Sequence, residues 1–293
     1  HTNKLFSQRS VDNTAYQFLS TYRKRFSLSA DEIADRRIFL DFDGVMLQTT
    51  AYLNGQCIGI HKGGFTPFSF DITDFVTDGD NVLTVYVDAT EDKTVPPYGG
   101  LVDFLTFGGI YRDVYLRFVD PYHIVDIFVR PADVLTNPRV ECDVQLSDWQ
   151  TALVLQARLE DVQGKVIAQI EQAIDDENFT LAFTDLEDIH LWTLENPAIY
   201  WLKLTLSADG VPIDDVNVRF GFRSAEFGDD GQFYFNGEPL NLFGLNRHQT
   251  YPYIGSAAPA RLQEMDADIL KFELGCNIVR TSHYPQSPHF LNR

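Results

Sequence analysis

The stretch FGLNRHQTYPYIGSAAPARLQEMDADILKFELGCNIVRTSHYP, residues 243–285, carries the clearest structural pattern of the chain. Four of its apolar residues follow one another at intervals of three, four and three, which places them on one face of a helix: Leu262, Met265, Ile269 and Phe272. Pro259 suits the first turn of that helix and Gly275 its end. Strand-like residues precede the helix, and residues 277–281 predict a buried strand after it. Strand, helix and strand in fewer than fifty residues predict a βαβ unit with parallel strands.

A histidine follows each predicted strand of this unit. The segment NRHQ (246–249) comes after the first strand, and SHYP (282–285) comes after the second. Because parallel strands joined by one crossover point the same way, both segments are expected at the same C-terminal edge, where β/α barrels build their active sites. A single loop histidine is commonly a surface or capping residue, and that alternative stays open for each one alone. Four basic residues are therefore the candidate site residues of this edge: Arg247, His248, Arg280 and His283.

Metal and serine chemistry are less well supported at this edge. A metal site would need a third ligand with suitable spacing beside His248 and His283, and the sequence offers none, so no metal site is predicted. Ser282 precedes His283 directly, but adjacent residues of an extended segment face opposite ways. The chain also lacks the GxSxG pattern of a nucleophile turn. A serine nucleophile is therefore not expected.

Upstream of residue 223 the sequence predicts two β-sandwiches. In RRIFLDFDGV (36–45), apolar and acidic residues alternate as in a strand with one buried face. The turn residues at 54–55, Asn-Gly, separate two further strand-like segments and are typical of a hairpin. Many such short strands predict a jelly roll over residues 1–121. Residues 122–222 carry about seven short strands with regular turns, which favours an immunoglobulin-like sandwich.

Glycine pairs in the first sandwich do not have the spacing of a phosphate-binding loop. The pairs at 99–100 and 108–109 are isolated, which is typical of turns or bulges. Arg112 and Asp113 follow the second pair at the start of a strand-like segment. We interpret them as a structural pair at that strand start.

The composition excludes several classes of function. The formal net charge is -19, and such a surface repels phosphate backbones and anionic lipid, so neither nucleic acid nor membrane is an expected partner. The hydrophobic fraction of 44% is enough for packed cores. Cys57, Cys142 and Cys276 are an odd number, widely spaced, without a CxxC pair. They predict buried thiols in a reducing compartment, and hence a cytoplasmic protein.

Several segments, taken in chain order, resemble the family-2 glycoside hydrolases, which comprise β-galactosidases, β-glucuronidases and their relatives. Three of them resemble the N-terminal sugar-binding jelly roll: YRKRF (22–26), AYLNGQCIGIHKGGFTPFSFDIT (51–73) and FGGIYRDVYL (107–116). LWTLENPAIYWLKL (191–204) resembles the end of the immunoglobulin-like middle domain. Two more resemble the first strands of the catalytic barrel: FNGEPLNLFGLNRHQTYPYIG (235–255) and NIVRTSHYP (277–285). The resemblance covers about residues 22–293. It implies a mostly β chain in which residues 223–293 begin an incomplete (β/α)8, or TIM, barrel.

The resemblance implies roles for four residues. Asp103 matches the acidic residue that the jelly roll contributes to the sugar pocket, and His248 matches the pocket histidine after the first barrel strand. Arg280 matches the arginine near the nucleophilic carboxylate, and His283 the histidine of the RxSHYP motif. Asp and His side chains can bond adjacent sugar hydroxyls, which both donate and accept hydrogen bonds. An arginine near the nucleophile would keep that glutamate ionised and oriented.

Members of this family cleave glycosides with two glutamates, an acid/base and a nucleophile, through a covalent glycosyl-enzyme. In the resemblance, both glutamates lie after the SHYP segment. A β/α barrel takes about 250 residues, and only seventy follow residue 223. The glutamates available there lie before the first barrel strand, in a turn or on the helix: Glu226, Glu238, Glu264 and Glu273. We therefore expect the catalytic pair beyond residue 293 and no catalysis by these 293 residues alone.

The expected function is that of the N-terminal part of a retaining exo-glycosidase acting on terminal β-D-galactosides. The wording NRHQ (246–249) resembles β-galactosidases more than β-glucuronidases, whose corresponding loop more often carries NKHE. The resemblance implies a β-galactoside or other small oligosaccharide as substrate and a homo-oligomer as the assembly. No cofactor is identifiable in the chain, although Mg and Na are possible in the full-length parent, with magnesium ligands downstream.

A different class of protein also fits part of the sequence. Residues 1–222 could form a non-catalytic carbohydrate-binding protein made of two sandwiches. The predicted helix at 259–275 argues against this alternative, because a dispensable tail would have no reason to bury an apolar face.

Overall fold

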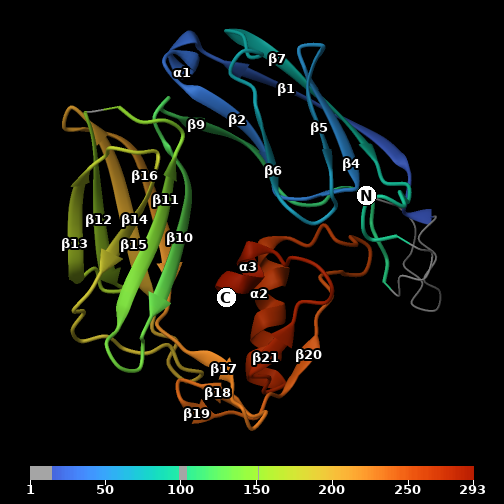
Figure 1. The fold of residues 1–293 in the computed structure, drawn as a ribbon. Helices are drawn as coiled ribbons and strands as arrows, with labels where there is room; N and C mark the ends of the chain where they lie inside the picture. The colour runs from blue at the N-terminus through green and yellow to red at the C-terminus, as the bar shows by residue number, and fades with distance from the viewer. Residues whose placement is uncertain (1–14, 99–103, 151) are drawn as a thin grey trace. The chain divides into compact units, whose positions relative to one another are not determined.

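The computed structural model describes residues 15–98, 104–150 and 152–293 (Figure 1). Its strands and helices divide into two compact units. The first unit joins the chain up to Phe118 with the segment Phe243–Arg293, and the second is Val119–Leu242. The segment that carries the two histidines therefore packs with the N-terminal sandwich rather than forming a unit of its own.

The N-terminal sandwich is built from two main sheets. The four-stranded antiparallel sheet has the order β1-β7-β4-β5 and contains β1 (Leu19–Leu28), β7 (Gly79–Asp88), β4 (Gln48–Leu53) and β5 (Gln56–Lys62). The three-stranded sheet has the order β6-β2-β9 and contains β6 (Phe68–Asp71), β2 (Arg37–Phe42) and β9 (Val114–Val119). The short pair β3 (Val45–Met46) and β8 (Gly109–Ile110) and the helix α1 (Ala30–Ile33) complete this part.

The alternating patterns of the sequence produce the core between these sheets. Ile38 and Phe42 of β2 are fully buried, and so is Val87 of β7. The Asn-Gly hairpin turn is confirmed, because Asn54 has φ 52° and Gly55 has φ 85° between β4 and β5. Two residues in the left-handed region match the right-handed twist of the strands they join.

The second unit is the immunoglobulin-like sandwich. One sheet has the order β10-β11-β14, with β10 (Ile124–Ala132), β11 (Arg139–Leu146) and β14 (Asn178–Phe183). The other has the order β13-β12-β15-β16, with β13 (Val166–Ala173), β12 (Leu153–Asp161), β15 (Tyr200–Ala208) and β16 (Val211–Phe220). Alternate residues of β11 are buried in its core, as their spacing predicts: Val140, Cys142, Val144 and Leu146. A small three-stranded sheet follows, with β17 (Ala225–Phe227), β18 (Phe233–Phe235) and β19 (Glu238–Pro239).

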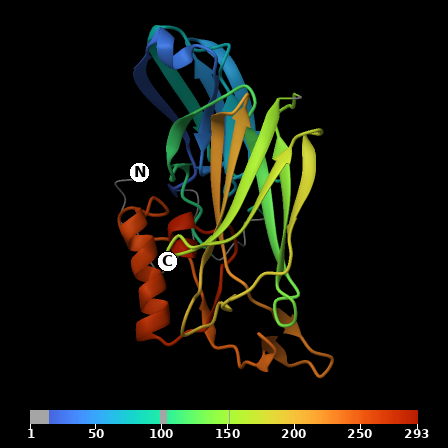
Figure 2. The same cartoon turned by 90° about the vertical axis from the view of Figure 1, so that its left-hand side faces the viewer.

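The C-terminal segment of the first unit contains the predicted βαβ unit. Its elements are β20 (Gly244–Asn246), α2 (Ala260–Asp268), a π-helical turn (Ile269–Glu273), β21 (Ile278–Arg280) and α3 (Pro288–Asn292). The strands β20 and β21 pair in parallel, with Gly244 opposite Ile278 and Asn246 opposite Arg280. Figure 2 shows α2 alongside these strands. The strand–helix–strand prediction and the parallel pairing are thus confirmed.

The predicted burial of the apolar helix face is wrong for Met265 and Phe272. Met265 is 42% exposed and Phe272 is 73% exposed, whereas the polar Gln263 of α2 is buried. The reason is Arg247, a buried arginine directly after β20, whose guanidinium bonds Gln263 and Asp266 of α2. The strand β21 is also more exposed than predicted, because it pairs with β20 along one edge. Phe243, the residue directly before β20, is also 64% exposed.

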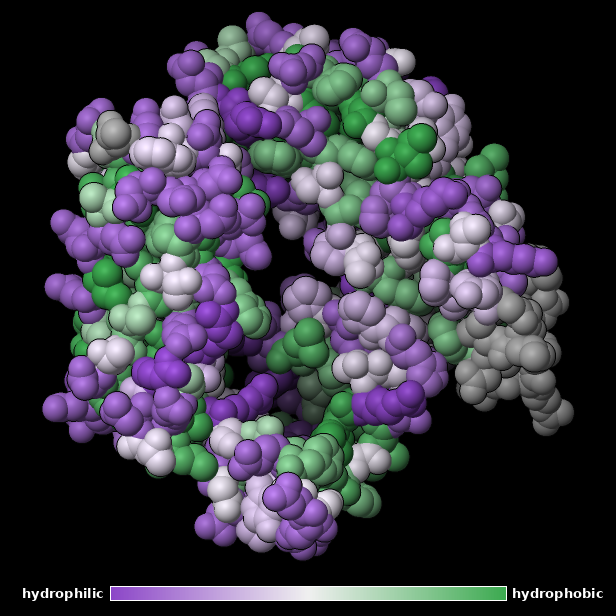
Figure 3. Space-filling view, in the orientation of Figure 1, coloured by the Kyte–Doolittle hydropathy of each residue, from purple (hydrophilic) through white to green (hydrophobic). Residues whose placement is uncertain are grey.

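Two further surface features bear on the sequence predictions. Cys142 and Cys276 are buried as expected, but Cys57 is exposed because it follows the hairpin turn on β5, so the prediction of three buried thiols is wrong at this position. Most of the face seen in Figure 3 is hydrophilic, in keeping with the acidic composition. No helix in the described part of the chain is long and apolar enough to cross a membrane.

Candidate functional site

The two histidines lie together at the C-terminal ends of the parallel strands. His248 follows β20 and His283 follows β21, and their ring centroids are 5.6 Å apart with an angle of 78° between the planes. Since β20 and β21 run in the same direction, the residues after them emerge at one edge. His248 is half-buried and His283 is exposed. The sequence prediction that these two side chains converge is confirmed.

Ser282 contacts both histidine rings. Its Oγ lies 3.0 Å from His283 Nε2 and 3.5 Å from His248 Nε2. The expectation that Ser282 and His283 face opposite ways is therefore wrong, because the chain bends at His283 instead of continuing the extended strand. Ser282 is 1% exposed. Its buried hydroxyl therefore lies between the two imidazole rings on the side that faces the protein interior.

Tyr284 orients the first histidine. Its hydroxyl oxygen accepts a hydrogen bond from the Gln249 amide at 3.3 Å and lies 3.2 Å from His248 Nδ1. Because that oxygen already accepts from Gln249, its own hydrogen is available to His248 Nδ1, which favours the tautomer protonated at Nε2. Burial raises the pKa of Tyr284, so the hydroxyl keeps its proton at neutral pH.

An aromatic side chain of the N-terminal sandwich completes the cluster. The ring of Phe104 lies 5.3 Å from that of His248, 5.8 Å from that of His283 and 5.5 Å from that of Tyr284, measured between centroids. Asp103, the acidic residue that the resemblance implies for the sugar pocket, directly precedes Phe104 but lies outside the described residues. The N-terminal sandwich therefore contacts the histidine pair through Phe104, the residue after Asp103.

Arg112 also bonds residues of the C-terminal segment, Gln249 and Pro285, whereas the sequence predicted a pair with Asp113. Its Nη2 donates to Gln249 Oε1 at 3.2 Å and to the Pro285 carbonyl at 2.7 Å. Its Nη1 donates to the carbonyls of Asp43 and Phe65, each at 3.3 Å. The structural pairing of Arg112 with its neighbour is thus wrong, because the side chain extends towards a segment distant in sequence.

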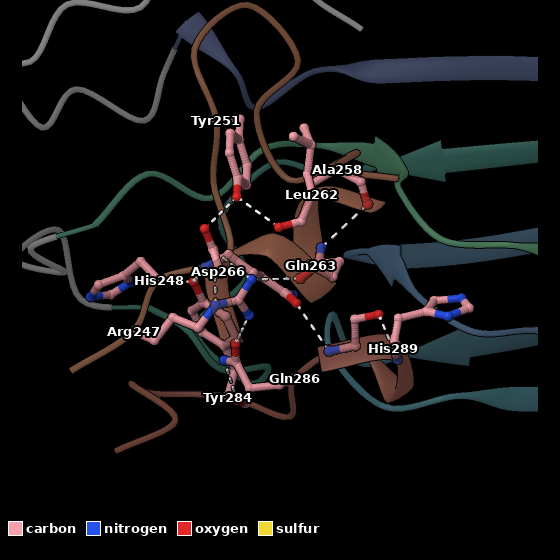
Figure 4. A network of polar contacts seen from close by, with 12 residues as sticks. Arg247, His248, Tyr251, Ala258, Leu262, Gln263, Asp266, Tyr284, Gln286 and His289 are labelled. Carbon is pink, nitrogen blue, oxygen red and sulfur yellow. Dashed lines mark hydrogen bonds and ion pairs between the residues drawn. The ribbon is translucent and has the colours of Figure 1, made fainter. Parts of the chain in front are cut away.

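Arg247 belongs to a buried network on the helix side of β20 (Figure 4). Its guanidinium donates to Asp266 at 2.7 and 3.0 Å and to Gln263 Oε1 at 2.6 Å, and it also bonds Gln286. The guanidinium carbon lies 4.1 Å from the centroid of the Phe290 ring. Arg247 is 5% exposed, so this charge is compensated inside the protein and holds α2 and α3 against the strand.

Tyr251 extends the same network. Its hydroxyl bonds the Leu262 carbonyl at 2.8 Å and the carboxylate of Asp266. Burial and the bond to this carboxylate raise the pKa of Tyr251. Arg247, expected among the site residues, is therefore a packing residue that supports the position of its neighbour, His248.

Arg280 and metal binding are the remaining predictions for this edge. Arg280 ends β21 with an exposed side chain, and no carboxylate in the described part of the chain forms an ion pair with it. Within residues 15–98, 104–150 and 152–293, no group of three or more His, Cys, Asp and Glu side chains is arranged to hold a metal ion.

Comparison with family models covers nearly the whole chain. Residues 6–120 match the sugar-binding domain of glycosyl hydrolases family 2, and residues 122–223 match the model named after the family itself. Residues 228–293 match its TIM barrel domain. The chain belongs to glycosyl hydrolases family 2. The predicted family and the predicted fold class, jelly roll, immunoglobulin-like sandwich and start of a TIM barrel, are thereby confirmed.

Relatives within family 2 are longer than this chain. The chain is 39% identical over its full length to the β-galactosidase of Thermoanaerobacter pseudethanolicus, and it covers 40% of that protein. It is 43% identical over its full length to the β-galactosidase of Thermoanaerobacterium thermosulfurigenes, covering 42% of it. Among solved structures, a β-glucuronidase of Bacteroides uniformis superposes with a TM-score of 0.87 at 29% identity, over 94% of this chain and 35% of that one.

Several residues around the histidine pair of this family-2 chain were not identified as site residues by the sequence analysis. They are Phe65, Phe104, Arg112, Gln249 and Tyr284. Gln249 and Tyr284 stand next to the two histidines within the quoted NRHQ and SHYP segments, which is a signal that could have included them. The other three come from the sandwich, and no local pattern there marks a contact with the C-terminal segment.

Proposed function

We propose that the protein containing these 293 residues is a retaining exo-glycosidase that removes terminal β-D-galactosyl groups by double displacement. The observation that carries this proposal is the convergence of His248 and His283, 5.6 Å apart, beside the ring of Phe104 in a family-2 chain. Two imidazoles present donors and acceptors to neighbouring sugar hydroxyls, and an aromatic ring offers a face for the apolar side of a sugar.

Each site residue has a proposed task in that reaction. Asp103, His248 and His283 bind hydroxyls of the terminal sugar. Arg280, at the exposed end of β21, holds the nucleophilic glutamate ionised and oriented. The nucleophile and the acid/base glutamate belong to later barrel strands, beyond residue 293. In a retaining enzyme their carboxyl groups stand about 5–5.5 Å apart, and the glycosyl-enzyme that forms is then hydrolysed by water.

The galactoside assignment rests on the relatives. Two β-galactosidases align with the entire chain at 39% and 43% identity. A second candidate within the family is β-glucuronidase activity, because a β-glucuronidase superposes over 94% of the chain. The two activities differ in the charge of the sugar, since a glucuronide carries a carboxylate that needs a cationic partner.

The test uses the full-length protein with nitrophenyl β-galactoside and nitrophenyl β-glucuronide. We expect a higher kcat/KM for the galactoside and retention of the anomeric configuration in the first product, observed by NMR. His248→Ala and His283→Ala should each lower kcat/KM by about ten- to a hundredfold, the effect of one lost hydrogen bond to a charged or partly charged group. His190→Ala is the control, because His190 is an exposed residue of the other unit. Preference for the glucuronide would establish the second candidate, and cleavage of neither glycoside would refute both.

The remaining expectations concern the whole protein. We propose a homo-oligomer and a cytoplasmic location, the latter supported by the unpaired Cys57, Cys142 and Cys276. Mg and Na are proposed only for the full-length protein. The described residues hold no group of three or more His, Cys, Asp and Glu side chains arranged for a metal ion, and the magnesium ligands are proposed to lie downstream of residue 293.

A further inference from the structure

Arg112 connects two parts of the first unit that are far apart in sequence. Its guanidinium donates to four oxygens, two in the sandwich and two in the C-terminal segment. Nη1 bonds the carbonyls of Asp43 and Phe65, and Nη2 bonds Gln249 Oε1 and the Pro285 carbonyl. We refer to Arg112 and these four acceptors as the Arg112 clamp.

The surroundings of Arg112 show that its conformation is fixed. The Nε atom is buried and lacks a hydrogen-bond partner in the described structure, so the side-chain hydrogen bonds come from the two Nη groups, and the guanidinium carbon lies 5.2 Å from the centroid of the Tyr111 ring. Gly44 leaves room for it, because a Cβ at that position would lie 3.0 Å from Arg112 Cδ and 2.8 Å from Tyr111 Cζ. Tyr111 in turn donates from its hydroxyl to the Gly64 carbonyl at 2.7 Å. The adjacent residues Tyr111 and Arg112 therefore bond the carbonyls of Gly64 and Phe65, which are adjacent residues of the loop between β5 and β6.

Both acceptors in the C-terminal segment are adjacent to the candidate site. Gln249 follows His248 directly, is 2% exposed, and its Oε1 also accepts from the Ser287 amide at 3.2 Å. Pro285 follows Tyr284, whose hydroxyl contacts His248. One guanidinium thus holds the turn after β20 and the turn after β21 at a fixed separation.

We propose that Arg112 is a positioning residue of the site, which sets the relative placement of His248 and His283 from the sandwich side. This inference rests on the proposed glycosidase function and deepens it. The N-terminal sandwich then contributes more than sugar-binding residues, because it also fixes the geometry of the two barrel turns. Displacement of a binding group by about 1 Å can cost on the order of a hundredfold in rate. Lysine cannot replace arginine here, because an ammonium group does not present the planar fork that spans four acceptors.

The kinetic test compares variants of the full-length protein at a temperature where each is shown to be folded. Arg112→Met and Arg112→Lys should both lower kcat/KM on the preferred nitrophenyl glycoside by about tenfold or more. Arg37→Met is the matched control, because Arg37 pairs with Asp71 within the sandwich and begins β2, whereas the clamp acceptor Asp43 follows the other end of that strand. It should leave kcat/KM unchanged. Full activity of folded Arg112→Met would overturn the proposal.

A double-mutant cycle separates positioning from mere stabilisation. If Arg112 acts through His248, then Arg112→Met should cost less than about threefold in a His248→Ala background, where the group to be positioned is already gone. Equal losses in both backgrounds would overturn the proposal. If Arg112→Met does not fold, Gly44→Ala and Gln249→Ala disturb the same clamp from opposite sides and take its place in the cycle.

A readout independent of activity keeps the inference separable from the proposed function. In Arg112→Met, amide hydrogen exchange should accelerate by about tenfold at residues 247–250 and 282–287, while the strands of the immunoglobulin-like sandwich keep wild-type exchange. Unchanged exchange in both turns would overturn the clamp whatever the substrate is. A wild-type protein that cleaves neither glycoside would refute the proposed function, and the exchange result would then decide the clamp alone.

Discussion

The rings of Phe65 and Tyr284 stack face to face, with centroids 4.4 Å apart and planes 6° from parallel. Phe65 lies in the loop between β5 and β6 of the sandwich, and Tyr284 lies in the turn after β21. The stack fixes the ring of Tyr284, while its hydroxyl bonds the Gln249 amide and contacts His248. Ring and hydroxyl therefore have separable tasks, the first in packing and the second in orienting the histidine.

This separation gives a prediction for Tyr284→Phe, which keeps the stacked ring and removes the hydroxyl alone. We expect kcat/KM of the full-length protein to fall by about tenfold, because the loss of one hydrogen bond of about 1.4 kcal/mol leaves His248 free to rotate. Tyr234→Phe is the matched control, because its hydroxyl bonds Asp230 in the other unit of the chain. It removes the same kind of hydroxyl and should leave kcat/KM unchanged. Equal kinetic effects of the two variants would contradict the assigned role of Tyr284.

We expect His61 to contribute to the loss of stability of the sandwich in acid. Its ring stacks on Phe68 with centroids 3.9 Å apart, and its Nε2 is buried and lacks a hydrogen-bond partner in the described structure. Burial disfavours the charged imidazole and holds the pKa of His61 below its ordinary value of 6.5. The unfolded chain therefore binds a proton at a higher pH than the folded chain does, and the free energy of unfolding decreases as pH falls below about 6.5.

His61→Phe removes this titration and keeps an aromatic ring on Phe68. We expect the variant to lose less stability than the wild type between pH 8 and pH 5, as measured by thermal unfolding in matched buffers. The carboxylates are common to both proteins, so their contribution cancels in the difference. A difference in unfolding temperature that is the same at both pH values would show that His61 does not carry the effect.

Short-range patterns predicted most of the fold for a physical reason. The alternation of apolar residues in β2 and β11 depends on which face of a strand a residue occupies, and this is set by its own position. The left-handed turn at Asn54 and the parallel direction of β20 and β21 are likewise local consequences of residue type and crossover length. The convergence of the two histidines followed directly from the strand direction.

Long-range contacts determined what the patterns missed. Arg112 bonds partners 137 and 173 residues further along the chain, a distance over which no spacing rule operates. The apolar spacing on α2 correctly predicted a helix, but its buried side is set by Arg247, a charge that needs polar partners once it leaves water. Ser282 and His283 departed from strand alternation because the chain bends between strand and loop. Neighbours in space, rather than in sequence, decided each of these cases.

Two arginine–aspartate pairs on α2 provide a matched comparison. Arg247 is 4% exposed at its side chain and bonds Asp266, whereas Arg293 is 51% exposed and bonds Asp268. Arg247→Met should destabilise the helix by about 3 kcal/mol, since it leaves a partly buried carboxylate uncompensated. Arg293→Met should have little effect, because water screens an exposed pair. Amide hydrogen exchange of Ala260–Asp268 in the full-length protein measures both, and similar effects of the two variants would contradict the assigned burial.

Asp103 provides the most direct test of the sandwich's contribution to the site. Asp103 lies outside the described residues, and the ring of the residue directly after it, Phe104, lies against His248, His283 and Tyr284. If Asp103 bonds a hydroxyl of the terminal sugar, Asp103→Ala in the full-length protein should lower kcat/KM by about ten- to a hundredfold, the value of a charge-assisted hydrogen bond of about 1.5–3 kcal/mol. Asp113→Ala is the control, because Asp113 is an exposed carboxylate of the same sandwich.

Both variants should unfold at temperatures close to that of the wild type, since an aspartate that binds substrate makes no large contribution to the unliganded fold. Wild-type kinetics in a folded Asp103→Ala variant would show that the aspartate is structural, and a loss of stability with unchanged kcat/KM would identify its role as packing of the loop that carries Phe104.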